Sequence, residues 1–181
     1  MDRLIEHSVI HRRNAIIIAI GGCFLVGIFF LTCYLSFTGR PVSIIEQAVE
    51  LALLLWLIKR AGGKYTYEVD KRALRVTKQG IFGRKTTIEI PFREMIGVYQ
   101  YAPKLVSVLK FRRTFLFHSS LDGRTVWTVA YTAQGRGNRQ ENRRLFFKPS
   151  EEMLDLLAAR MPGKVRVSEE TVVTEQLSKE K

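Results

Sequence analysis

Few residues in this chain are spaced as a catalytic or metal site requires. His118, Ser119 and Asp122 offer a base, a nucleophile and an orienting acid, but they are close neighbours at a predicted strand end and turn, where adjacent side chains point apart. His7 and His11 are four residues apart, in a segment without further metal-binding spacing. The sequence also lacks a phosphate-binding loop, a dinucleotide fingerprint and a Cys-x-x-Cys pair. These patterns predict a non-enzymatic protein with no metal and no cofactor.

Positive charge is the stronger chemical signal. The chain has a net charge of +12, and residues 59–181 hold 25 Lys and Arg against 13 Asp and Glu, whereas the first 58 residues hold four of each sign. A basic module tied to a membrane is attracted to anionic lipid, at roughly 1 kcal/mol for each well-placed Lys or Arg. Nucleic acid is the competing partner for such charge. A membrane tether makes lipid the closer partner, so we expect no nucleic acid.

A candidate site for membrane contact lies in the stretch "KQGIFGRK", residues 78–85. Two apolar residues occupy a predicted hairpin loop there, and basic residues flank them. An apolar tip with a basic rim is typical of a module that sits on an anionic bilayer. The alternative is that the apolar pair folds back over the β-domain. The predicted lipid-binding residues are Lys78, Ile81, Phe82, Arg84 and Lys85.

The membrane tether is predicted near the N-terminus. Residues 14–39 contain no Asp, Glu, Lys or Arg, and their core "AIIIAIGGCFLVGIFFLTCYLSF" would span roughly 35 Å as a helix, enough for a hydrocarbon layer of about 30 Å. The apolar run is longer than the roughly 7–15 residues of a signal peptide, and no small-x-small cleavage site follows it. We therefore expect a retained transmembrane helix.

A second apolar segment, residues 41–60, follows a short loop and predicts a transmembrane hairpin over residues 14–60. Small residues recur every four positions on each helix, which lets helices approach closely in lipid. Two carboxylates one turn apart on the second helix would face a partner helix or headgroups. The alternative is that Glu46 lies near the helix N-terminus, where negative charge is tolerated. The predicted helix–helix interface comprises Ala19, Cys23, Gly27, Glu46, Ala48, Glu50 and Ala52.

Flanking charges predict the orientation of this hairpin. Basic residues precede the first helix and follow the second, while the loop between them holds only Arg40. The positive-inside rule then places both termini in the cytoplasm, with residues 1–13 as a cytoplasmic segment. The expected location is the inner membrane, with a multi-pass topology.

The soluble part, residues 61–165, shows strand-like alternation between turn signals. Pro91 suits the corner between two strands because proline cannot donate to a sheet. "SLDGR" (120–124) predicts a tight hairpin turn, and residues 103–113 predict either a strand extension or a basic loop on the membrane. "PSEEMLDLLAARM" (149–161) predicts an amphipathic helix, and residues 166–181 a disordered tail. The predicted strands are 64–69, 73–78, 85–90, 95–101, 114–119, 125–132 and 144–148.

Two stretches carry a resemblance to a known family. "IPFREMIGV" (90–98) and "FKPSEEMLDLL" (147–157), in this order of elements, resemble bacterial pleckstrin-homology-like (PH-like) membrane proteins with an N-terminal transmembrane hairpin. The resemblance covers about residues 15–162. It implies a membrane-anchored all-β fold with a C-terminal helix, in which a seven-stranded, four-plus-three barrel follows the hairpin. It also implies binding of lipids or proteins rather than catalysis.

The sequence therefore supports two functional expectations. In the first, a cytoplasmic PH-like domain binds anionic lipid headgroups or a protein partner at the inner membrane face. In the second, the chain is an accessory or assembly subunit, or a homo-oligomer, that meets other membrane helices through its hairpin.

Overall fold

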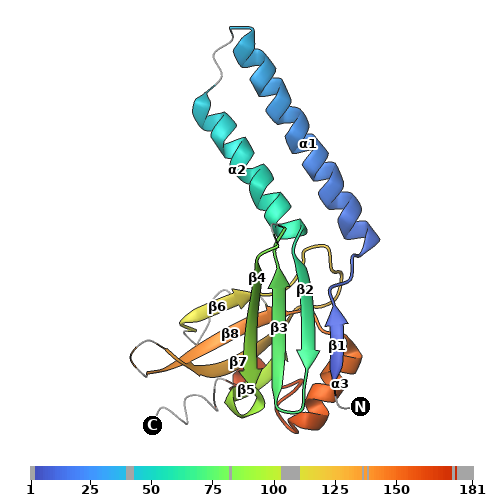
Figure 1. Ribbon diagram of the computed structural model, residues 1–181, viewed down its shortest axis with the longest axis vertical. Helices are drawn as coiled ribbons and strands as arrows, with labels where there is room; N and C mark the ends of the chain where they lie inside the picture. Colours follow the sequence, from blue (N-terminus) through green and yellow to red (C-terminus); the bar gives the residue numbers. More distant parts are fainter. Residues whose placement is uncertain are drawn as a thin grey trace.

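The computed structural model describes residues 3–39, 43–81, 83–102, 111–135, 137, 139–172 and 174. Two long helices project side by side from one end of a β-domain (Figure 1). The elements in chain order are β1 (Leu4–His7), α1 (Arg12–Phe37), α2 (Ile44–Ala61), β2 (Lys64–Val69), β3 (Ala73–Gln79), β4 (Lys85–Pro91), the 3₁₀ turn η1 (Phe92–Glu94), β5 (Met95–Gln100), β6 (Arg113–Leu116), β7 (Trp127–Gln134), β8 (Gln140–Phe147) and α3 (Glu151–Arg160).

The first sheet is antiparallel, with the order β1-β2-β3-β4. In β2, Tyr65, Tyr67 and Val69 alternate inward and are buried, as the period of two predicts. Strand β1 was not predicted from the sequence. It pairs with β2 from Leu4 opposite Val69 to His7 opposite Thr66, so residues before α1 belong to the β-domain.

The second sheet has the order β5-β7-β8-β6. Strands β5, β7 and β8 are antiparallel neighbours, but β6 runs parallel to β8 at the edge and does not pair with β7. The hairpin predicted at residues 120–124 is therefore wrong. The chain between β6 and β7 is instead a long connection that passes beneath the helices.

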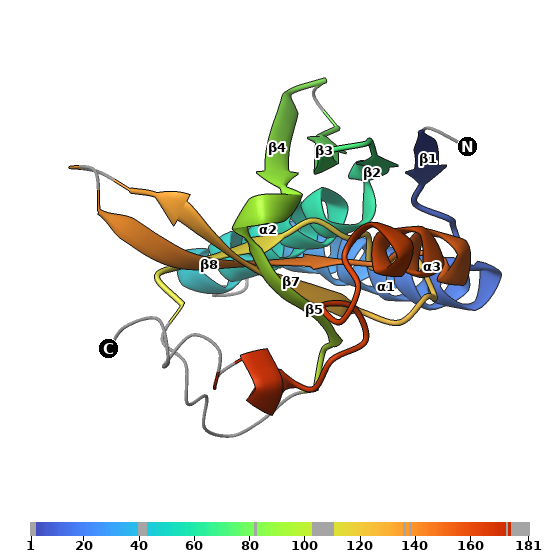
Figure 2. The ribbon, with the colours of Figure 1, turned by 90° about the horizontal axis from the view of Figure 1, so that it is seen from below.

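One hydrophobic core joins the two sheets and α3. The strands of one sheet run across those of the other, and α3 packs against β2 near β1 at an open side of this arrangement (Figures 1 and 2). Ser150 caps α3 by accepting a hydrogen bond from the Met153 N–H at 3.1 Å. Met153, Leu154 and Leu157 are fully buried, so the apolar stripe predicted for this helix closes the core.

The fold class predicted from the sequence is confirmed at the coarse level: a mostly β domain with a C-terminal helix, preceded by an apolar helix. The predicted count of four plus three strands is wrong. Each of the two sheets has four strands among the described residues, with β1 as the additional strand. No strand pair joins the two sheets in the part of the chain that the structure describes, so a closed barrel stays a prediction.

The start of the predicted disordered tail is ordered. Residues 164–167 run along β5, where the Val98 N–H donates to the Lys164 carbonyl at 2.7 Å. A helical turn follows, and Val172 is only 1% exposed against Ile96, Tyr99 and Ala130 on the outer face of the second sheet. The polar composition of this segment concealed the apolar residue that anchors it.

Of the described helices, α1 alone is long and apolar enough to cross a membrane. Helix α2 is shorter and carries Glu46, Glu50 and Lys59. It nevertheless packs along α1 in the opposite direction (Figure 1). The two-span topology stays a prediction.

Candidate functional site

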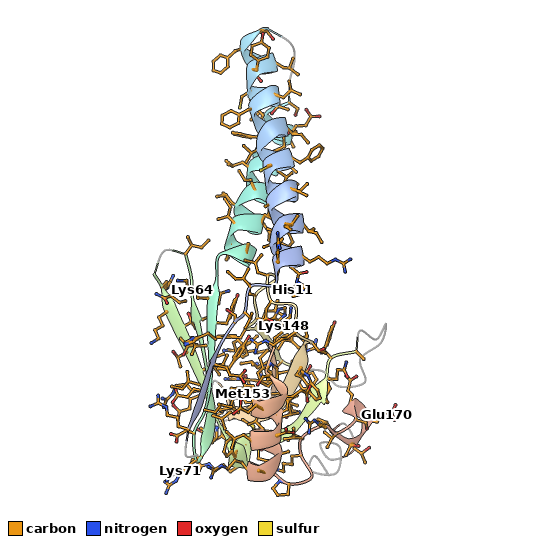
Figure 3. The ribbon with its side chains drawn as sticks, turned by 90° about the vertical axis from the view of Figure 1, so that its right-hand side faces the viewer. His11, Lys64, Lys71, Lys148, Met153 and Glu170 are labelled. Atoms are coloured by element: carbon orange, nitrogen blue, oxygen red, sulfur yellow. The ribbon has the colours of Figure 1, made fainter. Side chains whose placement is uncertain are left out.

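Three lysines gather where α2 meets the first sheet, and we call them the lysine cluster: Lys59, Lys64 and Lys78. Lys59 lies in the last turns of α2, Lys64 begins β2, and Lys78 is paired with Tyr65 across β2 and β3. Figure 3 shows Lys64 at the end of the sheet nearest the helices and Lys71 at the opposite end. The charges thus meet at the end of the β-domain from which the apolar helices project.

A cavity of about 170 Å³ opens beside two of these lysines, and we call it the lysine pocket. It is lined by Trp56, Lys59, Tyr65, Lys78, Leu116 and His118. The Lys78 ammonium lies 5.7 Å from the centroid of the Tyr65 ring, within range of a cation–π interaction. Since Tyr65 is buried, this contact holds one cation at the pocket wall. An ammonium group on a pocket wall is a suitable ligand for a phosphate oxygen.

The β3–β4 loop lies against the base of α2. A Cβ on Gly62 would lie 2.5 Å from the Cγ1 of Ile81, so the Ile81 side chain packs directly on the end of that helix. Ile81 remains 47% exposed, and Arg84 and Lys85 on the same loop are exposed. Phe82 lies outside the described residues. The predicted apolar tip is thus at the helix end, where Ile81 contacts α2 rather than the β-domain core.

Two arginines away from this end each form salt bridges with two carboxylates. Arg75 pairs with Glu68 and Glu89, and Arg166 pairs with Glu151 and Asp155. Among the residues that the structure describes, none of Lys59, Lys64, Arg84 and Lys85 forms a salt bridge with a carboxylate. These four side chains therefore add positive charge at the junction of helices and sheet.

A second cavity, of about 590 Å³, lies between the helix bases and the β-domain, and we call it the junction cavity. Its wall is formed by the β1–α1 connection, the α2–β2 connection and the loop that follows β6. Lys64 and Tyr65 line it, and Tyr65 also lines the lysine pocket. The two cavities are therefore neighbours around one aromatic ring.

A buried ionic network holds this junction in place. The Arg124 guanidinium donates to Asp122 Oδ2 at 2.7 Å and to Glu6 Oε2 at 3.1 Å. Asp122 is 0% exposed, and it also accepts a hydrogen bond from the Val9 N–H at 3.2 Å. Burial alone would raise the pKa of Asp122, but the hydrogen bonds and charge of Arg124 lower the pKa below its ordinary value. The network therefore contains an ionised, fully paired carboxylate.

Further polar contacts join this network to α3. Glu6 accepts hydrogen bonds from the Ser150 hydroxyl and from the Ser150 N–H. The Lys148 ammonium donates to the carbonyls of Ser119 and Asp122. The Tyr67 hydroxyl donates to the Phe117 carbonyl at 2.8 Å, and burial raises its pKa. Strand β1, the loop after β6 and the start of α3 are thus fixed together.

Helix α1 begins on the same loop. The His11 N–H donates to the Leu121 carbonyl at 2.8 Å, and the Asn14 side-chain amide donates to the Ser120 carbonyl at 3.3 Å. A Cβ on Gly123 would lie 2.9 Å from the His11 ring, so glycine permits this close approach. Figure 3 shows His11 at the base of α1, close above Lys148. These contacts fix the apolar helix to the β-domain.

His7, His11, Ser119 and Asp122 make local packing and hydrogen-bond contacts, whereas His118 lines the lysine pocket. His7 hydrogen-bonds Thr66 across β1 and β2, whereas His11 packs on Gly123. The Ser119 hydroxyl accepts from the Leu121 N–H, and the Asp122 carboxylate is held by Arg124 and Val9. The geometry provides no relay from Asp122 to a nucleophile within the described residues.

The residues of the predicted helix–helix interface occupy different positions on α1 and α2. Ala19, Cys23 and Gly27 line an open groove, and Glu46, Ala48 and Ala52 are exposed. Glu50 joins the two helices, since its carboxylate accepts a hydrogen bond from the Thr32 hydroxyl at 2.8 Å. The Gln47 amide donates to the Ser36 hydroxyl beside it. Ile18 and Gly22 on α1 and Leu54 and Leu57 on α2 line the same groove, and the helices approach each other at Gly22, where an added Cβ would lie 3.5 Å from Leu57.

Comparison with protein-family models, with curated proteins and with solved structures finds no match.

Sequence reasoning found Lys78 but missed four residues at the junction: Trp56, Lys59, Lys64 and Tyr65. A signal for two of them was present, because a Trp three residues before a Lys at the end of an apolar helix is typical of a membrane interface. Tyr65 gave no such signal, since its alternation with Tyr67 only predicted a buried face.

Proposed function

We propose that this chain is a non-enzymatic membrane protein whose β-domain binds anionic lipid headgroups at the cytoplasmic face of the inner membrane. The observation that carries the proposal is the lysine cluster at the end of the domain from which the apolar helices project. Lys59 and Lys78 line the lysine pocket, and Lys64 lines the junction cavity. Among the described residues no carboxylate forms a salt bridge with these lysines, and such lysines next to a bilayer attract phosphate.

The membrane placement is supported by the surface of the helices. Large apolar side chains are exposed along both α1 and α2, among them Phe24, Phe30, Leu55 and Trp56. Such a surface is unfavourable in water, because contiguous exposed apolar patches of this size mark a membrane or a partner. Since α2 packs along α1, we propose that both helices enter the bilayer and that both termini lie in the cytoplasm, in agreement with the flanking basic residues.

The β-domain supports a PH-like assignment only through its general layout. We propose that the two sheets and α3 form a PH-like domain in which β1 and the segment 164–167 are additions at the sheet edges. The proposed binding site is at the membrane-facing end, where Lys59 and Lys78 contact the phosphate, Arg84 and Lys85 add a positive rim, and Trp56 lies at the interface.

The proposal can be tested on the full chain in detergent by native mass spectrometry. We expect the wild type to retain phosphatidylglycerol over phosphatidylcholine from an equimolar mixture. Lys59→Gln with Lys78→Gln should reduce this preference by about 2 kcal/mol, or roughly 30-fold. Lys71→Gln with Arg72→Gln removes the same charge at the opposite end of the domain and should leave the preference unchanged. Equal effects of the two double variants would contradict the proposal.

A further inference from the structure

The junction cavity shares a lining residue, Ala61, with an apolar groove on the helices. The groove has a volume of about 580 Å³ and runs between α1 and α2. Gly22, Cys23 and Gly27 line it from α1, and Leu54, Leu57 and Ala61 line it from α2. Its volume lies within the roughly 300–1,000 Å³ of ligand sites, and its walls are apolar along their length.

The groove is narrow at Gly22 and open at Gly27. A Cβ on Gly22 would lie 3.5 Å from a methyl group of Leu57, which is ordinary contact, but a Cβ on Gly27 would have no atom within 4 Å. The helices therefore separate beside Gly27. In a bilayer this space is filled by hydrocarbon, since an apolar groove in lipid holds no water.

The lower end of the groove leads to the positive charge. Ala61 lines both the groove and the junction cavity, where Lys64 lies, and Tyr65 connects that cavity to the pocket of Lys59 and Lys78. An apolar groove followed by hydroxyl groups and then ammonium groups matches the parts of a phospholipid in sequence: the acyl chain, the glycerol and the phosphate. Ser8, Thr66 and Ser119 supply the hydroxyl groups in the junction cavity.

We propose that the protein holds one intact anionic phospholipid, with an acyl chain in the groove between α1 and α2 and its phosphate at the lysine cluster. This inference rests on the proposed function, and adds that the ligand is a whole lipid taken from within the bilayer rather than a headgroup alone. Because the network around Arg124 fixes α1 to the β-domain, the groove and the lysines stay in register. The site therefore selects for both parts of one molecule.

Filling the groove tests this inference. Gly27→Leu places a side chain in the groove. Because the acyl chain would then lose the burial of about two methylene groups, the full chain should retain phosphatidylglycerol about tenfold more weakly. Ala19→Leu, nearer the junction, should act in the same way and serves as a second variant if Gly27→Leu does not fold. Gly21→Leu is the matched control, because Gly21 has the same free space around it but does not line the groove. Glycerol 3-phosphate at the same concentration should not compete with the lipid.

The outcomes separate the two proposals. Weakening by Gly27→Leu and Ala19→Leu, with Gly21→Leu unchanged, supports the acyl-chain groove. If both groove variants retain lipid like the wild type while the Lys59 and Lys78 variant loses it, the groove inference is overturned and the headgroup site stands. Competition by glycerol 3-phosphate would likewise overturn the acyl-chain part. If every variant keeps the wild-type preference for phosphatidylglycerol, both the groove inference and the headgroup site are overturned.

Discussion

Arg124 is predicted to be the main stabilising residue of the junction. Its guanidinium joins Asp122, which is fully buried, to Glu6 in β1. Removing one partner of a buried ion pair costs about 3–5 kcal/mol, because the remaining charge is left unpaired. The Arg124 side chain is 23% exposed, so we expect Arg124→Met to cost about 3 kcal/mol, the lower end of that range. For a domain of this size the melting temperature should fall by roughly 10 °C.

Thermal unfolding of the full chain in detergent measures this effect. The sequence has two tryptophans, so a Trp56→Phe background leaves Trp127 in β7 as a reporter of the β-domain. Arg75→Met is the matched control, since Arg75 also pairs with two carboxylates but lies on the exposed face of the first sheet. We expect that variant to melt close to the wild type. Equal losses in Arg75→Met and Arg124→Met would refute the claim that burial of the network matters.

The same variant should reverse the pH dependence of stability. In the wild type the pKa of Asp122 is lowered, so the stability it contributes is present above the ordinary carboxyl pKa of about 4 and is lost as the pH falls below it. Without Arg124, burial is left as the main influence and raises that pKa. The Arg124→Met variant should therefore become more stable between pH 7 and pH 5, whereas the wild type should not. A parallel pH profile for both proteins would contradict this explanation.

Two further predictions concern other parts of the domain. Ser150→Ala removes the N-cap of α3 and should lower the free energy of unfolding by about 1 kcal/mol. Ser150→Asp should not restore this stability, because the new carboxylate would face Glu6. Wild-type stability of Ser150→Asp would show that Glu6 is not at the cap. Gly97→Val should release residues 168–172, since a Cβ on residue 97 would lie 2.6 Å from the Val172 side chain. Amide hydrogen exchange in residues 168–172 should then become faster. An unchanged exchange rate would show that this segment does not lie against Gly97.

The sequence predicted those elements whose pattern is local. Alternation at Tyr65, Tyr67 and Val69 predicted β2, and Ser150 with the apolar stripe behind it predicted α3. Strand β1 was missed because four residues are too few to show a period. The pairing of β6 with β8 was missed because a turn-like sequence such as "SLDGR" says nothing about which strand lies next in the sheet.

The candidate site could be predicted only in part, for a similar reason. Basic residues in 78–85 stood out as a cluster along the chain, whereas Lys59 and Tyr65 join Lys78 only after α2, β2 and β3 are folded together. For the helix interface, spacing by four identified a ridge on each helix but not the face that the neighbouring helix takes. The contact at Glu50 and Thr32 sets that face.

The lipids retained by the full chain after purification from its native membrane provide the most direct test of the lysine cluster as a headgroup site. After extended washing in detergent, we predict about one anionic phospholipid for each chain, and loss of that lipid when Lys59 and Lys78 are both changed to Gln. Retained lipid with the same composition as the bulk membrane, in both proteins, would contradict the proposed site.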